Sequence, residues 1–233
     1  MLLAVLLTLG ITVTMQAQIL NDAMKLIEPA KTGLSEKDAA TGIKEALIKG
    51  TGASVDLVSK LDGYFGNPEI KIPFPENARM IESKLRNIGL GSKVDEVILS
   101  INRAAEDAAK EAGPIFVTAI RNMSIQDAIQ IVSGKNDAAT QYLSRTTTPG
   151  LKAKFSPIVK ASLDKVNATR LWEDAMKAYN QIPFVTKQNP DLTAYVTDKA
   201  ISGLFIMIAK EELKIRQNPA ARTTEILRKV FGK

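Results

Sequence analysis

The residues that could carry out chemistry in this 233-residue chain are its carboxylates, amines, guanidinium groups and hydroxyls, because the sequence contains no histidine and no cysteine. That composition excludes thiol nucleophiles, Ser-His-Asp triads, disulfides and the usual zinc sites. Acid–base chemistry would have to use Asp or Glu, and a metal would have to be an oxygen-ligated ion such as Mg²⁺ or Ca²⁺. No grouping of residues points to such an ion, and we predict neither a metal nor a cofactor.

Two adjacent glutamates continue the apolar face of a predicted helix. The segment AISGLFIMIA at residues 200–209 is apolar on nearly every side, which predicts a central buried helix near residues 197–216. Its apolar stripe, followed in steps of three and four residues, leads to Glu211 and Glu212. A buried carboxylate needs a cation or hydrogen-bond donors, or its pKa rises until the group is neutral.

Arginines are the available partners for these carboxylates. Arg216 lies one helical turn beyond Glu212, and Arg103 or Arg222 could reach them from elsewhere in the fold. The favoured interpretation is an ion pair at the rim of the core. The alternative is an acid–base or ligand site that uses Glu211 or Glu212.

A second polar group lies in the segment NRAAEDAAK at residues 102–110. Arg103 and Glu106 occupy neighbouring turns, and the small alanines around them allow a second side of this helix to pack closely. We expect Arg103 and at least one of the paired glutamates to be buried in one network with Arg216 or Arg222.

One tryptophan and two polar neighbours form the last candidate contact. Trp172, Tyr179 and Asn180 belong to one predicted helix that ends before Pro183. A tryptophan in this setting favours a place in the core, and the alternative is an aromatic and polar contact for a ligand. The aromatic loop from Gly63 to Pro75 favours packing across the bundle over a role as a mobile flap.

The chain as a whole is predicted to be all-α, a single globular bundle of roughly nine or ten helices. Apolar residues recur with helical spacing, and no alternating strand pattern is present. Ser124 and Asp127 form a capping box that begins one helix, and Thr148 with Pro149 begins another. We also expect a break near Gly50.

The first residues resemble an export signal. An apolar run from Leu2 to Val13 is too short to span a membrane and ends in a small-residue cleavage context, so we predict cleavage near Ala17–Gln18. The prediction is a signal peptide at 1–17 and one helical domain at 18–233, exported to a periplasm. A chain without cysteines fits a bacterial envelope better than a eukaryotic secretory route, where a small domain would often carry disulfides. The mature chain is expected to have no transmembrane segment.

Charge is unevenly distributed along the mature chain. Residues 18–113 hold 13 basic and 15 acidic residues, a net charge of −2, whereas residues 114–233 hold 18 and 10, a net charge of +8. A basic half could meet an anionic surface such as lipid headgroups or envelope polysaccharide, although dispersed charges are typical of a solvated surface. Export, scattered charge and few aromatic residues argue against nucleic acid.

Four segments carry a resemblance to a known family: NRAAEDAA at 102–109, AATQY at 138–142, YNQIP at 179–183 and GLFIMIAKEELKIRQNPAARTTEILRKVFG at 203–232. They resemble the bacterial exported domain-of-unknown-function family 4197 across most of the mature chain. The resemblance implies an envelope setting and one helical domain, and it implies no catalytic residue. Many members of that family carry a lipoprotein cysteine after the leader, and this chain has no cysteine, so the resemblance does not extend to a lipid anchor.

The function favoured by these observations is a non-enzymatic exported module that binds a partner or a small ligand through a polar cluster. The first alternative is a carboxylate-based enzyme that uses Glu211 or Glu212. The second is a peripheral envelope protein whose basic half binds anionic lipid or polysaccharide. The sequence identifies no catalytic residue.

Overall fold

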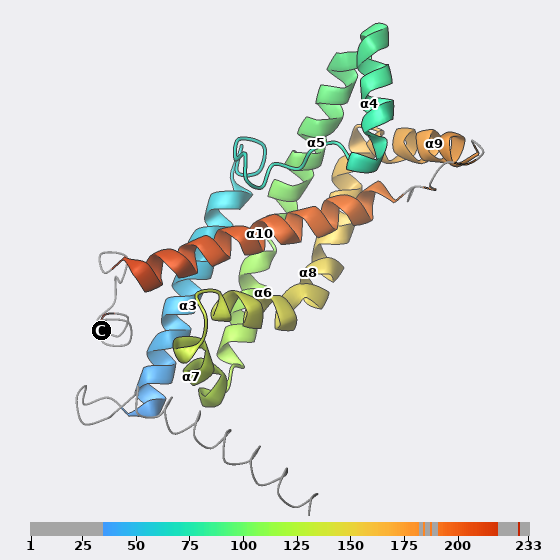
Figure 1. Cartoon of the computed structure of the whole chain (residues 1–233). Coiled ribbons are helices and arrows are strands. Elements are labelled where there is room, and N and C mark those ends of the chain that lie inside the picture. The colour runs from blue at the N-terminus through green and yellow to red at the C-terminus, as the bar shows by residue number, and fades with distance from the viewer. Residues whose placement is uncertain (1–34, 182–183, 185–186, 188–190, 219–227, 229–233) are drawn as a thin grey trace, which may run out of the picture.

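The computed structural model describes residues 35–181, 184, 187, 191–218 and 228, and every regular element within them is helical (Figure 1). This confirms the predicted all-α fold. The signal peptide expected at 1–17, Arg222 and most of the predicted last helix lie outside the described residues. The elements in chain order are α3 (Glu36–Ser59), η1 (Glu76–Ala78), α4 (Arg79–Leu85), η2 (Arg86–Leu90), α5 (Gly91–Ala109), α6 (Ala112–Arg121), α7 (Ile125–Ser133), α8 (Ala138–Lys165), α9 (Ala168–Asn180) and α10 (Leu192–Gln217).

Helix α10 is the central element of the bundle. It crosses α3, α5 and α8 and packs against all three, so the buried helix expected near residues 197–216 is confirmed with slightly wider bounds (Figure 1). Ala200, Leu204 and Ile208 form its inner face. By length and composition alone this helix could cross a membrane, but half of its most apolar stretch is buried against the other helices, as in the core helix of a globular bundle.

The described residues form fewer α-helices than the nine or ten expected, and two of the predicted breaks do not occur among them. Helix α3 runs through Gly50 without interruption. Helix α8 continues through both Pro149 and Pro157, so Thr148 does not begin a new helix. The Thr148 hydroxyl instead donates to the Ser144 carbonyl one turn back at 2.6 Å, within a continuous helix.

The cap predicted for α7 is present. The Ser124 side chain accepts a bond from the Asp127 amide at 3.0 Å, and the Asp127 carboxylate accepts one from the Ser124 amide at 3.1 Å. Both bonds satisfy amide groups that have no partner within the helix. The hydrogen bond from Ser124 lowers the pKa of Asp127 below its ordinary value.

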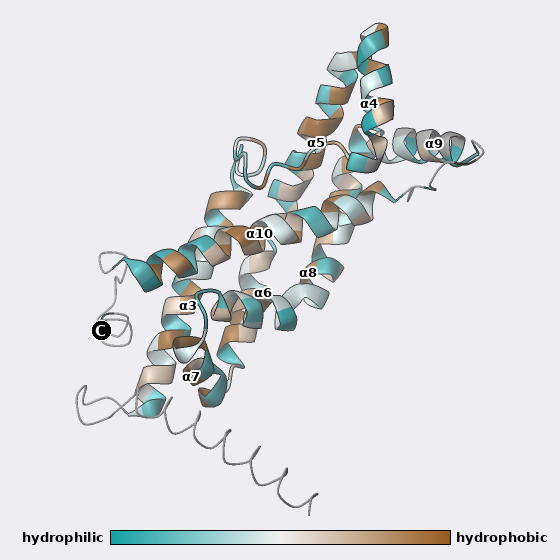
Figure 2. Ribbon diagram, viewed as in Figure 1, coloured by the Kyte–Doolittle hydropathy of each residue, from teal (hydrophilic) through white to brown (hydrophobic). Residues whose placement is uncertain are grey.

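One hydrophobic cluster joins α3, α5, α6, α8, α9 and α10, with Tyr64, Phe116, Phe155 and Leu204 among its fully buried members. Residues 76–100, which we call the arm, comprise η1, α4, η2 and the first half of α5, and contribute Ala78 and Val94 to this cluster. The arm projects from the body of the molecule (Figure 1) and carries apolar residues along α5 (Figure 2).

Candidate functional site

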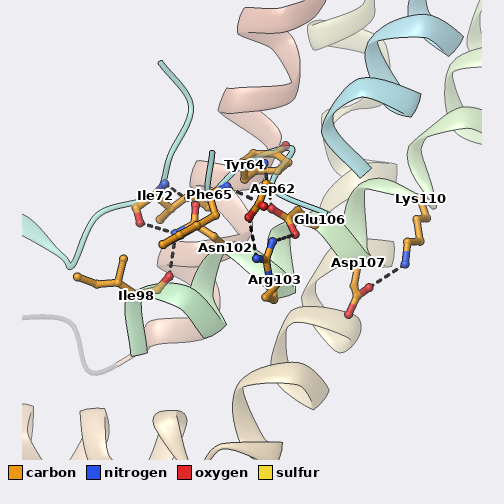
Figure 3. A network of polar contacts seen from close by, with 10 residues as sticks. All are labelled: Asp62, Tyr64, Phe65, Ile72, Ile98, Asn102, Arg103, Glu106, Asp107 and Lys110. Atoms are coloured by element: carbon orange, nitrogen blue, oxygen red, sulfur yellow. Dashed lines mark hydrogen bonds and ion pairs between the residues drawn. The ribbon is translucent and has the colours of Figure 1, made fainter. Parts of the chain in front are cut away.

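The polar side of α5 holds the loop at residues 60–75, which we call the clamped loop (Figure 3). Asn102 is fully buried and bonds to both backbone groups of one loop residue: its Oδ1 accepts from the Ile72 amide and its Nδ2 donates to the Ile72 carbonyl, both at 2.8 Å. The same Nδ2 donates to the Ile98 carbonyl at 2.8 Å. Asn102 therefore replaces the β-ladder or helix bonds that an irregular segment lacks.

Glu106 holds the other end of the clamped loop. Its Oε1 accepts from the amides of Tyr64 and Phe65 at 3.1 and 3.2 Å, and its Oε2 pairs with Arg103 Nη1 at 2.6 Å. Arg103 Nη2 then reaches Asp62 Oδ1 at 2.7 Å, so the guanidinium bridges two carboxylates. The Glu106 side chain is only 5% exposed.

Electrostatics reinforces this arrangement. The hydrogen bond to Glu106 is the main cause that raises the pKa of Arg103 above its ordinary value, with Asp62 adding to it. Two cations lie close to the Phe65 ring, with Lys71 Nζ 4.0 Å and the Arg103 guanidinium carbon 5.7 Å from its centroid. These contacts fix the aromatic residue of the loop against α5.

Tyr64 connects the clamped loop to the central helix. Its hydroxyl donates to the Ala200 carbonyl at 2.6 Å inside the core. A methyl group built on Gly203 would lie 2.8 Å from the Tyr64 ring, so this glycine is needed for the close approach. Burial, with a contribution from the Glu106 charge, raises the pKa of Tyr64 far above its ordinary value. The expectation that the loop packs across the bundle is confirmed.

A second network forms around Glu212, at the far end of α10. Glu212 Oε1 accepts from the Ala139 amide at 3.0 Å, and Oε2 accepts from the Thr140 amide at 2.9 Å and the Thr140 hydroxyl at 2.8 Å. Those amides belong to the first turn of α8 and have no acceptor within that helix. A negative charge at a helix N-terminus is also favourable for the helix dipole.

Arg216 completes this network with the opposite charge. Its Nε and Nη2 donate to Glu212 Oε1 at 3.0 and 2.7 Å, and it also donates to the carbonyls of Ile131 and Val132 in the last turn of α7. A cation at a helix C-terminus is favourable for the same reason that the carboxylate suits the N-terminus. We call Glu212 and Arg216 the bracket, because together they join the end of α7 to the start of α8.

The predicted residues thus form two networks and not one. Arg103 pairs with Glu106 and Asp62, whereas Glu212 pairs with Arg216. Ala200, which the clamped loop contacts, and Glu212 are 12 residues apart on α10, or about 18 Å at 1.5 Å per residue. The expected link between Arg103 and the paired glutamates is therefore absent from the described contacts.

The two adjacent glutamates differ sharply in environment. Glu212 has a side chain 7% exposed, whereas that of Glu211 is 30% exposed and its carboxylate lies 3.4 Å from Lys214 Nζ. Helical geometry separates their directions by about 100° around the axis, because one turn takes 3.6 residues. Arg222, the other predicted partner, lies outside the described residues.

Of the three residues in the predicted aromatic and polar contact, Trp172 lies in the core. Trp172 is 7% exposed and meets Phe74 of the clamped loop edge to face, with centroids 5.6 Å apart. Asn180 is half-buried at the last position of α9. The side chain of Tyr179 lies outside the described part of the structure.

One hollow borders the second network, and another lies apart from both networks. The first is apolar and lies between α3 and α10, with Leu47, Ile208 and Ile215 in its wall and the bracket at its edge. The other is an open cleft between α6 and α8, where the Thr118 and Thr146 hydroxyls donate to carbonyls of their own helices at 2.8 and 2.9 Å. No cluster of three potential metal ligands occurs among the residues that the structure describes.

The arm is the surface that sequence reasoning missed. Met80 and Ile88 are 61% and 70% exposed, and Leu90 and Leu99 are also exposed. The spacing of Met80, Lys84 and Ile88 at four-residue intervals was the available signal, since it places them on one helix face. Nothing in the sequence showed that this face would project from the bundle.

The two networks stabilise the fold, and their carboxylate oxygens are already engaged in hydrogen bonds. The oxygens of Glu106 and Glu212 already accept bonds from backbone amides, hydroxyls and arginines. A general acid or base must instead contact the proton that it transfers. The described geometry therefore fits positioning of the chain better than proton transfer.

A family model for proteins of unknown function, DUF4197, matches residues 33–232. The chain belongs to this family. The comparisons with curated proteins and with solved structures each gave no match. The motifs NRAAEDAA and AATQY, which carry the resemblance, contain four residues of the two networks: Asn102, Arg103, Glu106 and Thr140.

Proposed function

We propose that this protein is a non-enzymatic binding module that contacts a protein partner through its arm. The observation that carries the proposal is the exposure of large apolar side chains on an element that projects from the body. Helix α4 and η2 contain no buried residue, and α5 contains only Val94 before Ile101. Exposed apolar surface of this kind is typical of protein contact sites.

The charges of the arm indicate the kind of partner. Its four basic and four acidic residues give no net charge. Several of them pair within the arm: Arg79 with Glu76, Arg86 with Glu82 and Asp95, and Lys93 with Glu96. Such a surface has no electrostatic preference for an anionic membrane or a polyanion, and it suits an apolar protein surface.

The saturation of the two polar networks supports a binding role over the carboxylate-enzyme alternative. Both oxygens of Glu212 accept bonds from α8 or Arg216, and the partly exposed Glu211 lies beside Lys214. Under this proposal, the two networks keep the body rigid so that it presents the arm.

We also propose export, on the apolar run at residues 2–13 and on a family match that begins only at residue 33. The expected mature N-terminus is Gln18. Mass spectrometry of the protein from its own host measures it directly, and an intact Met1 in a cytoplasmic fraction would contradict this part of the proposal.

The binding proposal is tested by the size of the complexes that the protein forms in extracts of its host. We expect Met80→Glu/Ile88→Glu to elute at lower mass than the wild type on gel filtration. The matched control is Ile125→Glu, because Ile125 is 43% exposed and lies on α7 at the opposite end of the molecule (Figure 1). Equal elution of the wild type and the arm variant would overturn the proposal.

A further inference from the structure

The apolar hollow between α3 and α10 is lined by side chains from several helices. The aliphatic residues of its wall include Ile43, Ala46, Leu47, Ile131, Ile208 and Ile215. On α10, Ile208 and Ile215 are seven residues apart, so this side of the hollow is about 10 Å long at 1.5 Å per residue. An apolar groove between two helices fits one face of a third helix, whose apolar side chains recur every three or four residues.

The chain that follows α10 starts at the edge of this hollow. Ile215 and Arg216 line the hollow, α10 ends at Gln217, and Asn218 is extended, with φ of −108° and ψ of 110°. Pro219 comes next, and a proline disfavours the helical conformation in the residue before it, so the sequence itself ends α10 here. The family match runs on to residue 232, so the segment after Pro219 belongs to the same family domain as the bundle.

The sequence of this last segment, residues 220–233, has the pattern of an amphipathic helix. Ile226, Leu227 and Val230 recur at helical spacing among polar residues. Of this segment the structure describes Arg228, which is helical and exposed. Ile226 and Val230 are each two residues from Arg228, or about 160° away around a helix axis. On a helix with Arg228 facing solvent, these two apolar residues therefore lie on the opposite face.

We infer that residues 220–233 are the segment that covers the apolar hollow, with Ile226 packed against its aliphatic wall. A helix that turned back at Pro219 would place Ile226 about 10 Å along α10 from the turn, within the span of about 3–14 Å that the wall from Ile215 to Ile208 occupies. Because the segment is tethered to α10, its local concentration at the hollow is on the order of millimolar, which favours it over a free partner. The inference concerns a different face from the arm and is independent of the proposed function.

Thiol reactivity in the full chain tests the inference, because the sequence has no cysteine and each variant therefore carries a single thiol. We expect Ile226→Cys to react with Ellman's reagent at least about tenfold more slowly than Arg228→Cys, since burial protects a thiol. Arg228→Cys is the matched control, because it lies two residues away at an exposed position. The labelling rates should not depend on protein concentration, because the contact lies within one chain.

A second substitution shows whether the hollow causes this protection. Added to Ile226→Cys, Leu47→Glu places a charge in the wall of the hollow and should raise the labelling rate towards that of Arg228→Cys. Leu57→Glu, at an exposed position of the same helix, should leave the rate unchanged. Gly50→Leu fills part of the hollow without a charge and replaces Leu47→Glu if a thermal melt shows that variant to be unfolded; a methyl group at position 50 meets only ordinary contacts.

Three results would overturn the inference. The first is equal labelling rates for Ile226→Cys and Arg228→Cys, because the hollow would then lack this cover. The second is protection of Ile226→Cys that persists in the folded hollow variants, which would place the segment against another surface. The third is protection that increases with protein concentration, which would mean that a second copy of the chain supplies the contact.

Discussion

Replacing Glu212 by Gln tests the structural role of the bracket, and Glu211→Gln on the same helix is a control with the same chemistry. A glutamine has one acceptor oxygen and one NH₂ group, so it cannot accept from Ala139, Thr140 and Arg216 together. At least one backbone amide of α8 loses its partner, and the Arg216 ion pair is lost. Removing one partner of a buried ion pair costs about 3–5 kcal/mol.

The control substitution removes a much weaker interaction. Glu211 is partly exposed and 3.4 Å from Lys214 Nζ, and exposed pairs contribute about 0–1 kcal/mol. For a domain of this size, 1 kcal/mol shifts the melting temperature by about 2–4 °C. We therefore expect Glu212→Gln to lower it by roughly 6–20 °C, and Glu211→Gln by a few degrees at most.

Urea unfolding followed by circular dichroism provides the free energies for both variants. A difference between them below about 1 kcal/mol would refute the reasoning, because a buried carboxylate that accepts from five donor groups would then contribute no more than a surface one. Recovery of stability in Glu212→Gln when Arg216→Met is added would confirm that the unpaired arginine causes part of the loss.

Three further predictions concern single contacts. Asn102→Ala should cost about 2–4 kcal/mol, because it leaves two buried backbone groups unpaired, and hydrogen exchange should accelerate in the clamped loop; unchanged exchange there would contradict it. Gly203→Ala should cost about 1–3 kcal/mol by overpacking the tyrosine of that loop, whereas Gly50→Ala, whose methyl would meet only ordinary contacts, should be neutral or stabilising in the same melts. Ser124→Ala should raise the pKa of Asp127, which NMR titration measures. Because this pKa is lower in the folded than in the unfolded chain, the ionised carboxylate stabilises the fold above the unfolded pKa of about 3.9, and the stabilisation is lost as pH falls through the folded pKa. The variant should therefore lose less stability on acidification than the wild type.

Helical periodicity and local caps could be predicted from the sequence. The Ser124 capping box and the buried α10 follow from patterns within one segment. The missing breaks in α3 and α8 could not be predicted in this way, since packing against neighbouring helices overrides the weak preferences of Gly50 and Pro149. Local sequence patterns indicate the conformation that a segment favours in isolation, whereas tertiary packing determines the conformation that the segment adopts in the bundle.

The candidate residues were recognisable, but their partners were not. Glu212 and Arg216 are one turn apart, so their pairing follows from helical geometry. Glu106 and Asn102 bond to backbone groups 30 to 42 residues away. Because nearly every residue has a backbone amide, the sequence does not show which amides a distant side chain will contact. The sequence therefore indicated that these polar residues needed partners without showing that loop and helix ends would supply them.

The central claim is that the arm, and not the polar networks, is the surface through which this protein binds. Site-specific photo-cross-linking in the host tests it most directly, with a photoreactive amino acid placed at Ile88 and, as the control, at Ile125. We predict a discrete adduct of higher mass at position 88 and none at position 125. Absence of an adduct at position 88, or the same adducts at both positions, would contradict the claim.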